Sequence, residues 1–425
     1  MKVLVLSNLY PPDTVGGYEL GCRQVVDALR ALGHDVLVLT TAPRTPTETF
    51  AHVQRSLKLT DMWDFHAEHH SAPITLRLKE SEAFQINAFN VHVLVNAIRS
   101  FEPDVVYVWM LVGIGGLGLM SCLHHLKVPW VWHLMDEVPT KLCSYFYRVQ
   151  PELAREFSRQ MRGAFLSCSQ QLVDDIEHAG FDLGANVALM PNWVTGPRSA
   201  PRSRYYSGGR LRVVGAAALI DRNYDKGIDL LISAAVLLRE RGYEDFGLDI
   251  YGAVNDGSFA EAIRGKGLTR HVTLKGPLDQ STLLERYHDY DVFAFPGRTG
   301  EPFGFAPLEA LSRGCVPVIN RRCGVGEWLV HGVHCLKASR DAESFANVIA
   351  RVLDGELRLE AIARRGEEAV WRDFHLEAQI PSIEKSLERA SATPRLDAGS
   401  EADAYRLAML AEKLSSILLQ DDCAA

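Results

Sequence analysis

The chain has 425 residues, which is enough for two or three domains at roughly 100–200 residues each. Hydrophobic residues make up 47% and charged residues 23%, so a sizeable core is available, as in ordinary soluble proteins. The net charge of −8 argues against non-specific binding of nucleic acid, although it leaves room for a local basic pocket that binds phosphate.

Three features bear on the cell compartment. The eight cysteines stand singly, without a CxxC pair or zinc spacing, so we expect buried thiols in a reducing, cytoplasmic compartment. Met1-Lys2 leads straight into an apolar run, without the layout of a signal peptide. The uncharged run Val105–Leu123 is nearly long enough to cross a bilayer, but four glycines interrupt it. We therefore interpret it as a strand, a loop and the start of a helix.

The first half of the chain alternates strands with helices, which is the pattern of a parallel sheet. A helix is predicted at Glu19–Leu32, ending at Gly33. Strands are predicted at Met1–Asn8, Asp35–Thr40, Asp104–Trp109, Trp130–Leu134 and Ala164–Cys168. Between Arg44 and Ser81 the pattern weakens, and we expect a long irregular insertion there.

A polar, proline- and glycine-containing stretch, Thr195–Gly209, is interpreted as a linker, and a second α/β series follows it. Strands are predicted at Leu211–Ala216, Leu248–Gly252, Val272–Lys275, Val292–Phe295 and Val316–Ile319, and helices at Ile228–Arg241, Asp341–Leu353 and Leu357–Trp371. We expect two doubly wound α/β domains, residues 1–196 and 197–375, with ligands at the carboxyl ends of the strands. Residues 376–425 are predicted to be a helical segment and tail, in which the helix Glu401–Leu419 docks on the body or on a second copy of the chain.

The stretch Phe295–Asn320 (FPGRTGEPFGFAPLEALSRGCVPVIN) carries the strongest chemical signal. Pro307 suits the first turn of a helix, so Glu301 lies in the preceding loop and Glu309 in the first turn. Free amides at a helix start suit a phosphate or a sugar hydroxyl, and a carboxylate accepts hydrogen bonds from two ribose hydroxyls. Taken alone, the two glutamates would be better explained as a loop acid and an ordinary helix-start acid, because acids favour helix starts.

The surrounding motifs resemble those of family 4 of the retaining glycosyltransferases, which adopt the GT-B fold of two Rossmann-like domains facing a cleft. The resemblance covers roughly residues 1–375 and rests on several motifs together. These are the first strand with its loop, Pro191-Asn192, Lys226-Gly227, Glu301 to Glu309 (EPFGFAPLE) with Ala310-Leu311, and Gly314 to Val318 (GCVPV).

The resemblance implies a role for each matching position. Glu309 looks like the carboxylate that binds ribose, Glu301 like the clamp on the transferred sugar, and Lys226 like the lysine that binds the diphosphate. A fixed ammonium there would stabilise the charge that the departing diphosphate gains. The implied catalytic residues are His133, Glu301 and Lys226. The implied donor-binding residues are Gly16, Gly17, Arg222, Lys226, Glu301, Phe303, Gly304, Phe305, Leu308 and Glu309.

The acceptor side is expected to involve Tyr18, Glu19, Asp136 and Glu137. One departure from the family pattern concerns the phosphates: the family commonly has an arginine after the glycine that ends the first strand of the second domain, whereas Gly215 is followed by three alanines. Arg222 is the expected substitute, and Arg298 a weaker one. No metal site is evident, and the proposed chemistry needs neither a metal nor a cofactor.

The sequence therefore predicts a retaining glycosyltransferase that moves a sugar from a nucleotide-diphosphate sugar, by default a UDP-sugar, to a hydroxyl of a glycan, a lipid-linked sugar or a small natural product. A lipid-linked acceptor would bring peripheral membrane contact. The alternatives are a catalytically silent GT-B binding protein and a sugar-nucleotide epimerase, since a fold does not fix a function. A nicotinamide-dependent dehydrogenase is disfavoured, because Pro11 to Gly17 is not a G-x-G-x-x-G loop.

Overall fold

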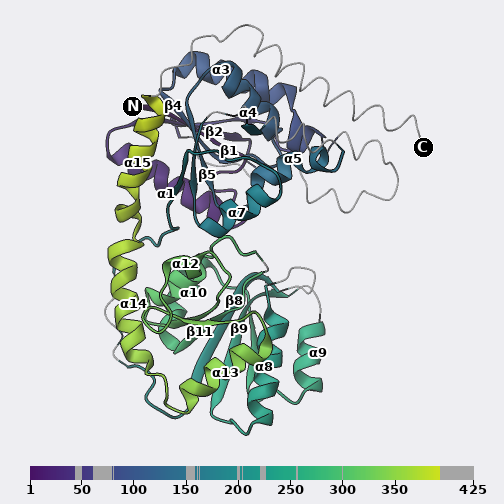
Figure 1. The fold of residues 1–425 in the computed structure, drawn as a ribbon, viewed down its shortest axis with the longest axis vertical. Coiled ribbons are helices and arrows are strands. Elements are labelled where there is room, and N and C mark those ends of the chain that lie inside the picture. Colours follow the sequence, from purple (N-terminus) through teal and green to yellow (C-terminus); the bar gives the residue numbers. More distant parts are fainter. Residues whose placement is uncertain are drawn as a thin grey trace, which may run out of the picture. The chain divides into compact units, whose positions relative to one another are not determined.

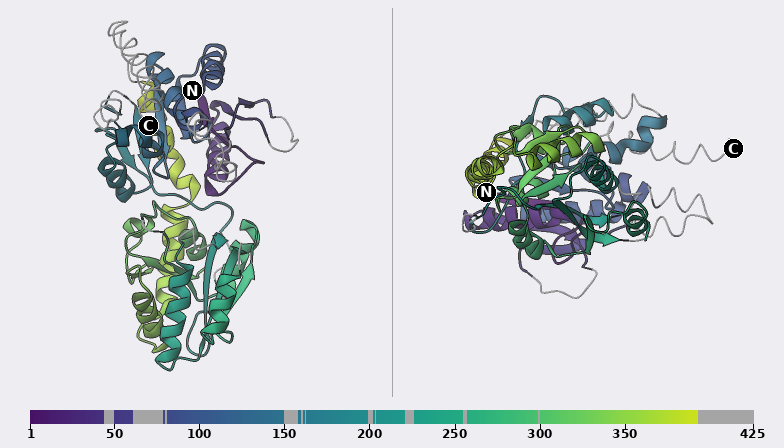
Figure 2. Two further views of the ribbon diagram at one scale, coloured as in Figure 1. Left: turned by 90° about the vertical axis from the view of Figure 1, so that its right-hand side faces the viewer. Right: turned by 90° about the horizontal axis from the view of Figure 1, so that it is seen from below.

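The computed structural model describes residues 1–43, 50–60, 79, 81–149, 158–159, 161, 163–198, 202, 204–220, 226–254, 257–298 and 300–392. The chain forms two compact units. The first contains Met1–Ser167, Leu172–Met190 and the chain from Ile380 onward; the second contains Cys168–Gln171 and Pro191–Gln379. Figures 1 and 2 show a sheet with helices packed against it in each unit.

The first unit is built on a seven-stranded parallel sheet in the order β3-β2-β1-β4-β5-β6-β7. Its strands are β1 (Lys2–Ser7), β2 (Asp35–Thr41), β3 (Val53–Leu57), β4 (Val105–Met110), β5 (Trp130–Leu134), β6 (Ala164–Ser167) and β7 (Val187–Leu189). Its helices are α1 (Gly17–Ala31), the short η2 (Ser81–Gln85), α3 (Ala88–Phe101), α4 (Gly116–His125), α5 (Val138–Val149) and most of α7 (Gln170–His178). All five predicted strands of this half are confirmed.

The apolar run considered as a membrane span is resolved into two elements, as predicted. It forms β4 and α4, with Gly113 and Gly115 at positive φ in the loop between them. Glycine is needed at Gly115, because a Cβ there would lie 2.2 Å from the backbone nitrogen of Asn87. Among the described residues, none of the helices combines the length and the apolar character that crossing a bilayer requires.

The expectation of an irregular insertion between Arg44 and Ser81 is wrong for one segment. Val53–Leu57 forms β3, which pairs in parallel with β2 through Val38↔Val53 and Leu39↔Gln54. This strand lies at the sheet edge, and only Leu57 of its five residues is fully buried, so it lacks the apolar run of the central strands. Residues 44–49, 61–78 and 80 lie outside the described part.

The second unit is built on a six-stranded parallel sheet in the order β10-β9-β8-β11-β12-β13. Its strands are β8 (Leu211–Ile220), β9 (Phe246–Val254), β10 (Val272–Gly276), β11 (Val292–Phe295), β12 (Val316–Asn320) and β13 (Leu336–Ala338). Its helices are α8 (Ile228–Glu240), α9 (Ser258–Gly265), α10 (Gln280–Arg286), η3 (Tyr287–Asp289), α11 (Ala306–Leu311), α12 (Val325–Trp328), α13 (Ala342–Leu353) and α14 (Leu359–Asp373). The predicted strands and helices of this half are all present, with ends shifted by a few residues.

The helical segment predicted after residue 375 begins with α15 (Leu376–Ser391). From Ile380 onward it belongs to the first unit, where the Glu384 carboxylate lies 2.8 Å from Nε2 of His34. Figure 1 shows the yellow end of this helix beside the N-terminus, where the Ser391 hydroxyl contacts the sulfur of Met1. The predicted helix Glu401–Leu419 and its proposed docking lie outside the described residues.

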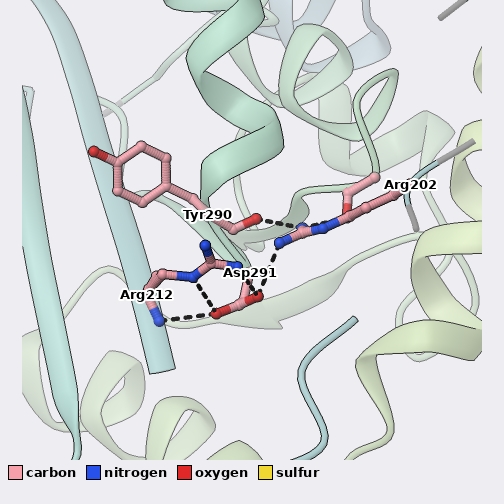
Figure 3. A network of polar contacts seen from close by, with 5 residues as sticks. Arg202, Arg212, Tyr290 and Asp291 are labelled. Atoms are coloured by element: carbon pink, nitrogen blue, oxygen red, sulfur yellow. Dashed lines mark hydrogen bonds and ion pairs between the residues drawn. The ribbon is translucent and has the colours of Figure 1, made fainter. Parts of the chain in front are cut away.

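The predicted linker contains a buried anchor. The Arg202 guanidinium donates to Oδ1 of Asp291 at 2.9 Å and to the carbonyl of Tyr290 (Figure 3). The same carboxylate accepts two hydrogen bonds from the Arg212 side chain, at 3.1 and 3.3 Å. Arg212 and Asp291 lie where β8 and β11 begin, so this network fastens the linker to the amino-terminal edge of the sheet, opposite the edge where ligands bind in such folds.

Candidate active site

The second sheet has a switch in strand order between β8 and β11. These neighbouring strands run parallel, with Val292 opposite Val213, yet the chain leaves β8 toward β9 and leaves β11 toward β12. The two connections therefore diverge at the carboxyl ends of the strands, which is where doubly wound sheets bind their ligands. Lys226 follows β8, and Glu301 follows β11.

The structure brings the predicted Lys226 and Glu301 together at this switch point. Nζ of Lys226 donates to Oε2 of Glu301 at 2.9 Å, and the amide of Arg298 donates to the same oxygen at 3.3 Å. The Glu301 side chain is only 10% exposed, whereas the Lys226 side chain keeps 23% exposure. The ammonium thus compensates a buried carboxylate and still reaches solvent, which is where a charged ligand would enter.

Two glycines bring the loops of this site into contact. Gly227 has φ +73°, and a Cβ on it would lie 2.5 Å from Cβ of Pro296, so glycine fixes Lys226 against the loop after β11. Gly324, at the start of α12, donates its amide to the carbonyl of Glu301 at 2.9 Å. A Cβ on Gly324 would lie 1.7 Å from the carbonyl oxygen of Pro302. The loop that carries Glu301 is therefore held from both sides.

The loop after Glu301 ends in the helix that carries Glu309. No described residue accepts a hydrogen bond from the amides of Phe303, Gly304 or Phe305. The amide of Leu308, a predicted donor-binding residue, donates to the carbonyl of Phe305 at 3.0 Å in the first turn of α11.

Glu309 is half-buried in α11, and its carboxylate has one described partner. Nε2 of Gln280, the first residue of α10, donates to Oε1 at 2.6 Å. Burial raises the pKa of Glu309, and the hydrogen bond from Gln280 partly opposes that rise by stabilising the ionised form. An acceptor-only carboxylate with one oxygen so fixed suits a pair of vicinal hydroxyls.

The glycine loop of the first unit follows β1 and leads into α1. Oε2 of Glu19 accepts hydrogen bonds from the amides of Val15 and Gly16, at 3.1 and 3.0 Å, and the side chain is buried. The guanidinium of Arg55 on β3 donates to the carbonyls of Tyr10 and Pro11, at 3.3 and 2.5 Å. Glu19, expected on the acceptor side, thus caps the helix and orders the loop.

Gly16 has no structural requirement for glycine within the described protein. Its φ of −172° is ordinary extended backbone, and a Cβ built on it would meet no atom within 4 Å. Gly17 is the first residue of α1. A side chain at position 16 would therefore fit the described fold.

His133 lies near the end of β5 and is buried. Its Nδ1 lies 2.5 Å from the hydroxyl of Tyr107, and its ring packs edge-on against Trp109, with centroids 4.7 Å apart. Burial lowers the pKa of His133 to about 3, so the imidazole is neutral at physiological pH.

This burial predicts a pH-dependent stability. The unfolded chain binds a proton at His133 below about pH 6.5, whereas the folded chain resists it until about pH 3, so stability falls as the pH falls between these values. The slope from this one group is about 1.4 kcal/mol per pH unit. Denaturant titrations at pH 7 and pH 5 should show this loss in the wild type and less of it in His133→Gln. Equal pH dependence of stability in both proteins would show that His133 is not the group with the lowered pKa.

The remaining acceptor-side candidates lie around the start of α5 and α1. Oδ1 of Asp136 accepts from the amide of Glu137 at 2.8 Å, and Oδ2 accepts from Nζ of Lys141 at 3.0 Å. The Glu137 carbonyl accepts from the Thr140 hydroxyl at 2.7 Å. Tyr18, in the first turn of α1, accepts a hydrogen bond at its carbonyl from Nε1 of Trp109.

Two family sequence models match the chain. One, described as Glycosyltransferase Family 4, covers residues 15–195, and the other, described as Glycosyl transferases group 1, covers residues 220–369. The matched ranges contain Gly16, His133, Lys226, Glu301 and Glu309. This chain belongs to the family 4 glycosyltransferases.

Relatives of this glycosyltransferase extend over most of its length. It is 26% identical over 416 residues to the glycogen synthase of Mycobacterium tuberculosis, covering 88% of this chain and 91% of the relative. Its fold is similar to that of sucrose-phosphate synthase from Thermosynechococcus elongatus (TM-score 0.66, 16% identity, 91% of this chain and 98% of the other). It is also similar to Anabaena HepE in complex with UDP (TM-score 0.65, 18% identity, 92% of this chain and 100% of the other). The predicted GT-B fold is confirmed by these neighbours and by the two parallel sheets.

The sequence left three contacts of the glycosyltransferase site unpredicted. Nε of Arg340 donates to the carbonyl of Gly297 at 3.0 Å, Gln280 binds Glu309, and Tyr107 binds His133. Of these three contacts, only the one between Tyr107 and His133 could have been anticipated, because the two residues lie on neighbouring predicted strands. The expected substitute for the family arginine, Arg222, lies outside the described residues. Within the described part of the chain, no group of three or more His, Cys, Asp or Glu residues could hold a metal ion.

Proposed function

We propose that this glycosyltransferase transfers a sugar from a nucleotide-diphosphate sugar, with a UDP-sugar as the first candidate, to a hydroxyl acceptor with retention of the anomeric configuration. The observation that carries the proposal is the Lys226–Glu301 pair at the switch point of the second sheet, with Glu309 on the helix that follows. The similar HepE structures contain UDP and UDP-glucose, which supports the choice of donor.

Each group has one task in the proposed reaction. Glu309 accepts hydrogen bonds from the ribose hydroxyls, and Glu301 with the amides of Phe303 to Phe305 holds hydroxyls of the transferred sugar. Lys226 faces the diphosphate, and its ammonium charge attracts the phosphate oxygens. Arg222 remains the proposed second cation.

The chemical step is then a displacement at the anomeric carbon. The bond from C1 to the phosphate oxygen breaks, and the negative charge that develops on the diphosphate is stabilised by Lys226. The acceptor hydroxyl attacks from the face that the diphosphate leaves, and its proton passes to a phosphate oxygen. The new C1–O bond has the configuration of the old one, and the balance calls on no metal ion or cofactor.

An assay of donor turnover tests this proposal. The protein is incubated with α-linked nucleotide sugars, UDP-glucose first, with a panel of hydroxyl acceptors and with water alone, and the anomeric proton of the product is followed by NMR. We expect release of the nucleoside diphosphate and an α-configured product before mutarotation. A β-configured product would overturn retention, turnover into an epimerised donor would favour the epimerase, and binding without turnover would favour the silent binding protein.

Gly16 provides a test with an internal control. We expect Gly16→Ala to leave the melting temperature unchanged, because its Cβ meets no protein atom, but to raise the Kd of the donor about tenfold by blocking close approach of the phosphates. Calorimetric titration of both proteins measures the change. Gly115→Ala is the matched control, because its Cβ would collide with Asn87 and should lower stability instead. If Gly16→Ala were stable and bound the donor with unchanged affinity, the glycine loop would not be part of the donor site.

A further inference from the structure

The tyrosine beside His133 lies on the neighbouring strand and the same face of the sheet. Tyr107 is opposite Val131 in the parallel register of β4 and β5. Because side chains alternate along strands, Tyr107 and Trp109 share the face of Val131 and His133. Trp130 and Trp132 belong to the other face, where both rings contact Phe165.

The short contact between Tyr107 and His133 indicates which group donates. Oη of Tyr107 and Nδ1 of His133 are 2.5 Å apart, and both side chains are almost completely buried. Hydrogen bonds from N–H groups to oxygen span about 2.7–3.2 Å, whereas those from O–H groups are shorter. A phenol is also a stronger acid than a neutral imidazole. The hydroxyl therefore donates, and Nδ1 accepts.

Accepting at Nδ1 determines the rest of the imidazole. A neutral imidazole has one N–H, so the proton then lies on Nε2. Burial keeps the ring neutral by lowering the pKa of His133 and keeps the phenol protonated by raising the pKa of Tyr107. Trp109 fixes the plane of the ring through its edge-on contact and is itself held by the hydrogen bond to the carbonyl of Tyr18 at 2.8 Å.

We propose that Tyr107 is a positioning residue that holds His133 as the neutral tautomer protonated on Nε2, so that His133 takes no proton from the acceptor. The part of this inference that concerns the substrate rests on the proposed function. The tautomer itself does not, because it follows from the contacts within the first unit.

The tautomer is read directly by NMR. Long-range ¹H–¹⁵N spectra of the full chain with ¹⁵N-labelled histidine separate the two neutral forms, and the signal missing in His133→Gln assigns His133. We expect the pattern of a ring protonated on Nε2 only, unchanged between pH 8 and pH 6. In Tyr107→Phe we expect a mixture of tautomers. A wild-type ring protonated on Nδ1, or an imidazolium, would overturn the proposal whether or not the variant folds.

Turnover separates positioning from general stability. We expect Tyr107→Phe to lower kcat/KM for donor turnover about tenfold and to have no further effect in a His133→Gln background, because Tyr107 acts through the imidazole. The control is Tyr243→Phe. Tyr243 follows α8, and the variant loses its 2.8 Å hydrogen bond to Asp354, which follows α13; turnover should be unchanged. Additive losses in the double variant would contradict positioning. A wild type without turnover would refute the proposed function alone, since the spectra would still decide the tautomer.

Discussion

Lys226→Ala is expected to lower kcat of sugar transfer by about 100- to 1,000-fold, the loss typical when one fixed donor to a developing negative charge is removed. The ammonium lies at the switch point of the second sheet, 2.9 Å from Glu301 and still partly exposed. Its charge matters most when the diphosphate departs, so KM should change less than kcat. Steady-state kinetics of donor turnover measure both quantities.

The control for this variant is an ion pair at the other end of the same helix. Lys226 precedes α8, and Arg241 follows its last residue and lies 3.8 Å from Glu343. Arg241→Ala removes a surface pair worth no more than about 1 kcal/mol and should leave kcat within twofold. If both variants lost activity equally, or if Lys226→Ala kept it, Lys226 would have no role in the chemical step.

Glu309→Ala is expected to raise the Kd of the nucleoside diphosphate by about 10- to 100-fold, because hydrogen bonds to a charged group contribute about 1.5–3 kcal/mol. The loss should concern the ribose, so the variant should bind UDP and 2′-deoxy-UDP about equally, whereas the wild type should prefer UDP. Glu356→Ala, which loses an exposed pair with Arg351, is the control. If Glu309→Ala still preferred UDP over 2′-deoxy-UDP, the ribose hydroxyls would not bind to Glu309.

The raised pKa of Glu309 adds a pH dependence with a definite sign. Burial moves this pKa above 4.5, so affinity for the nucleotide should be full at neutral pH and fall as the pH drops through the raised value. Gln280→Ala removes the hydrogen bond that lowers this pKa and should move the loss of affinity to higher pH. Calorimetric titrations between pH 5 and pH 8 measure the midpoint in both proteins.

The elements that the sequence predicted are those with a local pattern. Central strands such as β1 and β11 are buried on both faces and therefore appear as continuous apolar runs. The helices α8 and α13 are buried on one face and therefore have apolar residues at helical spacing. The edge strand β3 has only one fully buried residue, and its pairing with β2 depends on a partner distant in sequence. Such a strand has no pattern of its own.

The contacts of the candidate site likewise fall into those that the sequence could predict and those that it could not. The pairing of Lys226 with Glu301 could be expected, because both positions follow strands that meet at one sheet edge and match a family motif. The contacts from Gln280 to Glu309 and from Arg340 to Gly297 join residues whose types are ordinary for helix starts and surfaces. The buried Arg202 within a polar linker is similar, since its partners Asp291 and Tyr290 lie far along the chain.

A crystal structure of the protein with a bound nucleoside diphosphate, UDP first, tests the central claim most directly. We expect the outer phosphate within ion-pair distance of Nζ of Lys226, and the ribose hydroxyls hydrogen-bonded to the Glu309 carboxylate beside Gln280. A nucleotide bound away from the carboxyl ends of β8 and β11, with Glu309 and Lys226 making no contact to it, would contradict the account.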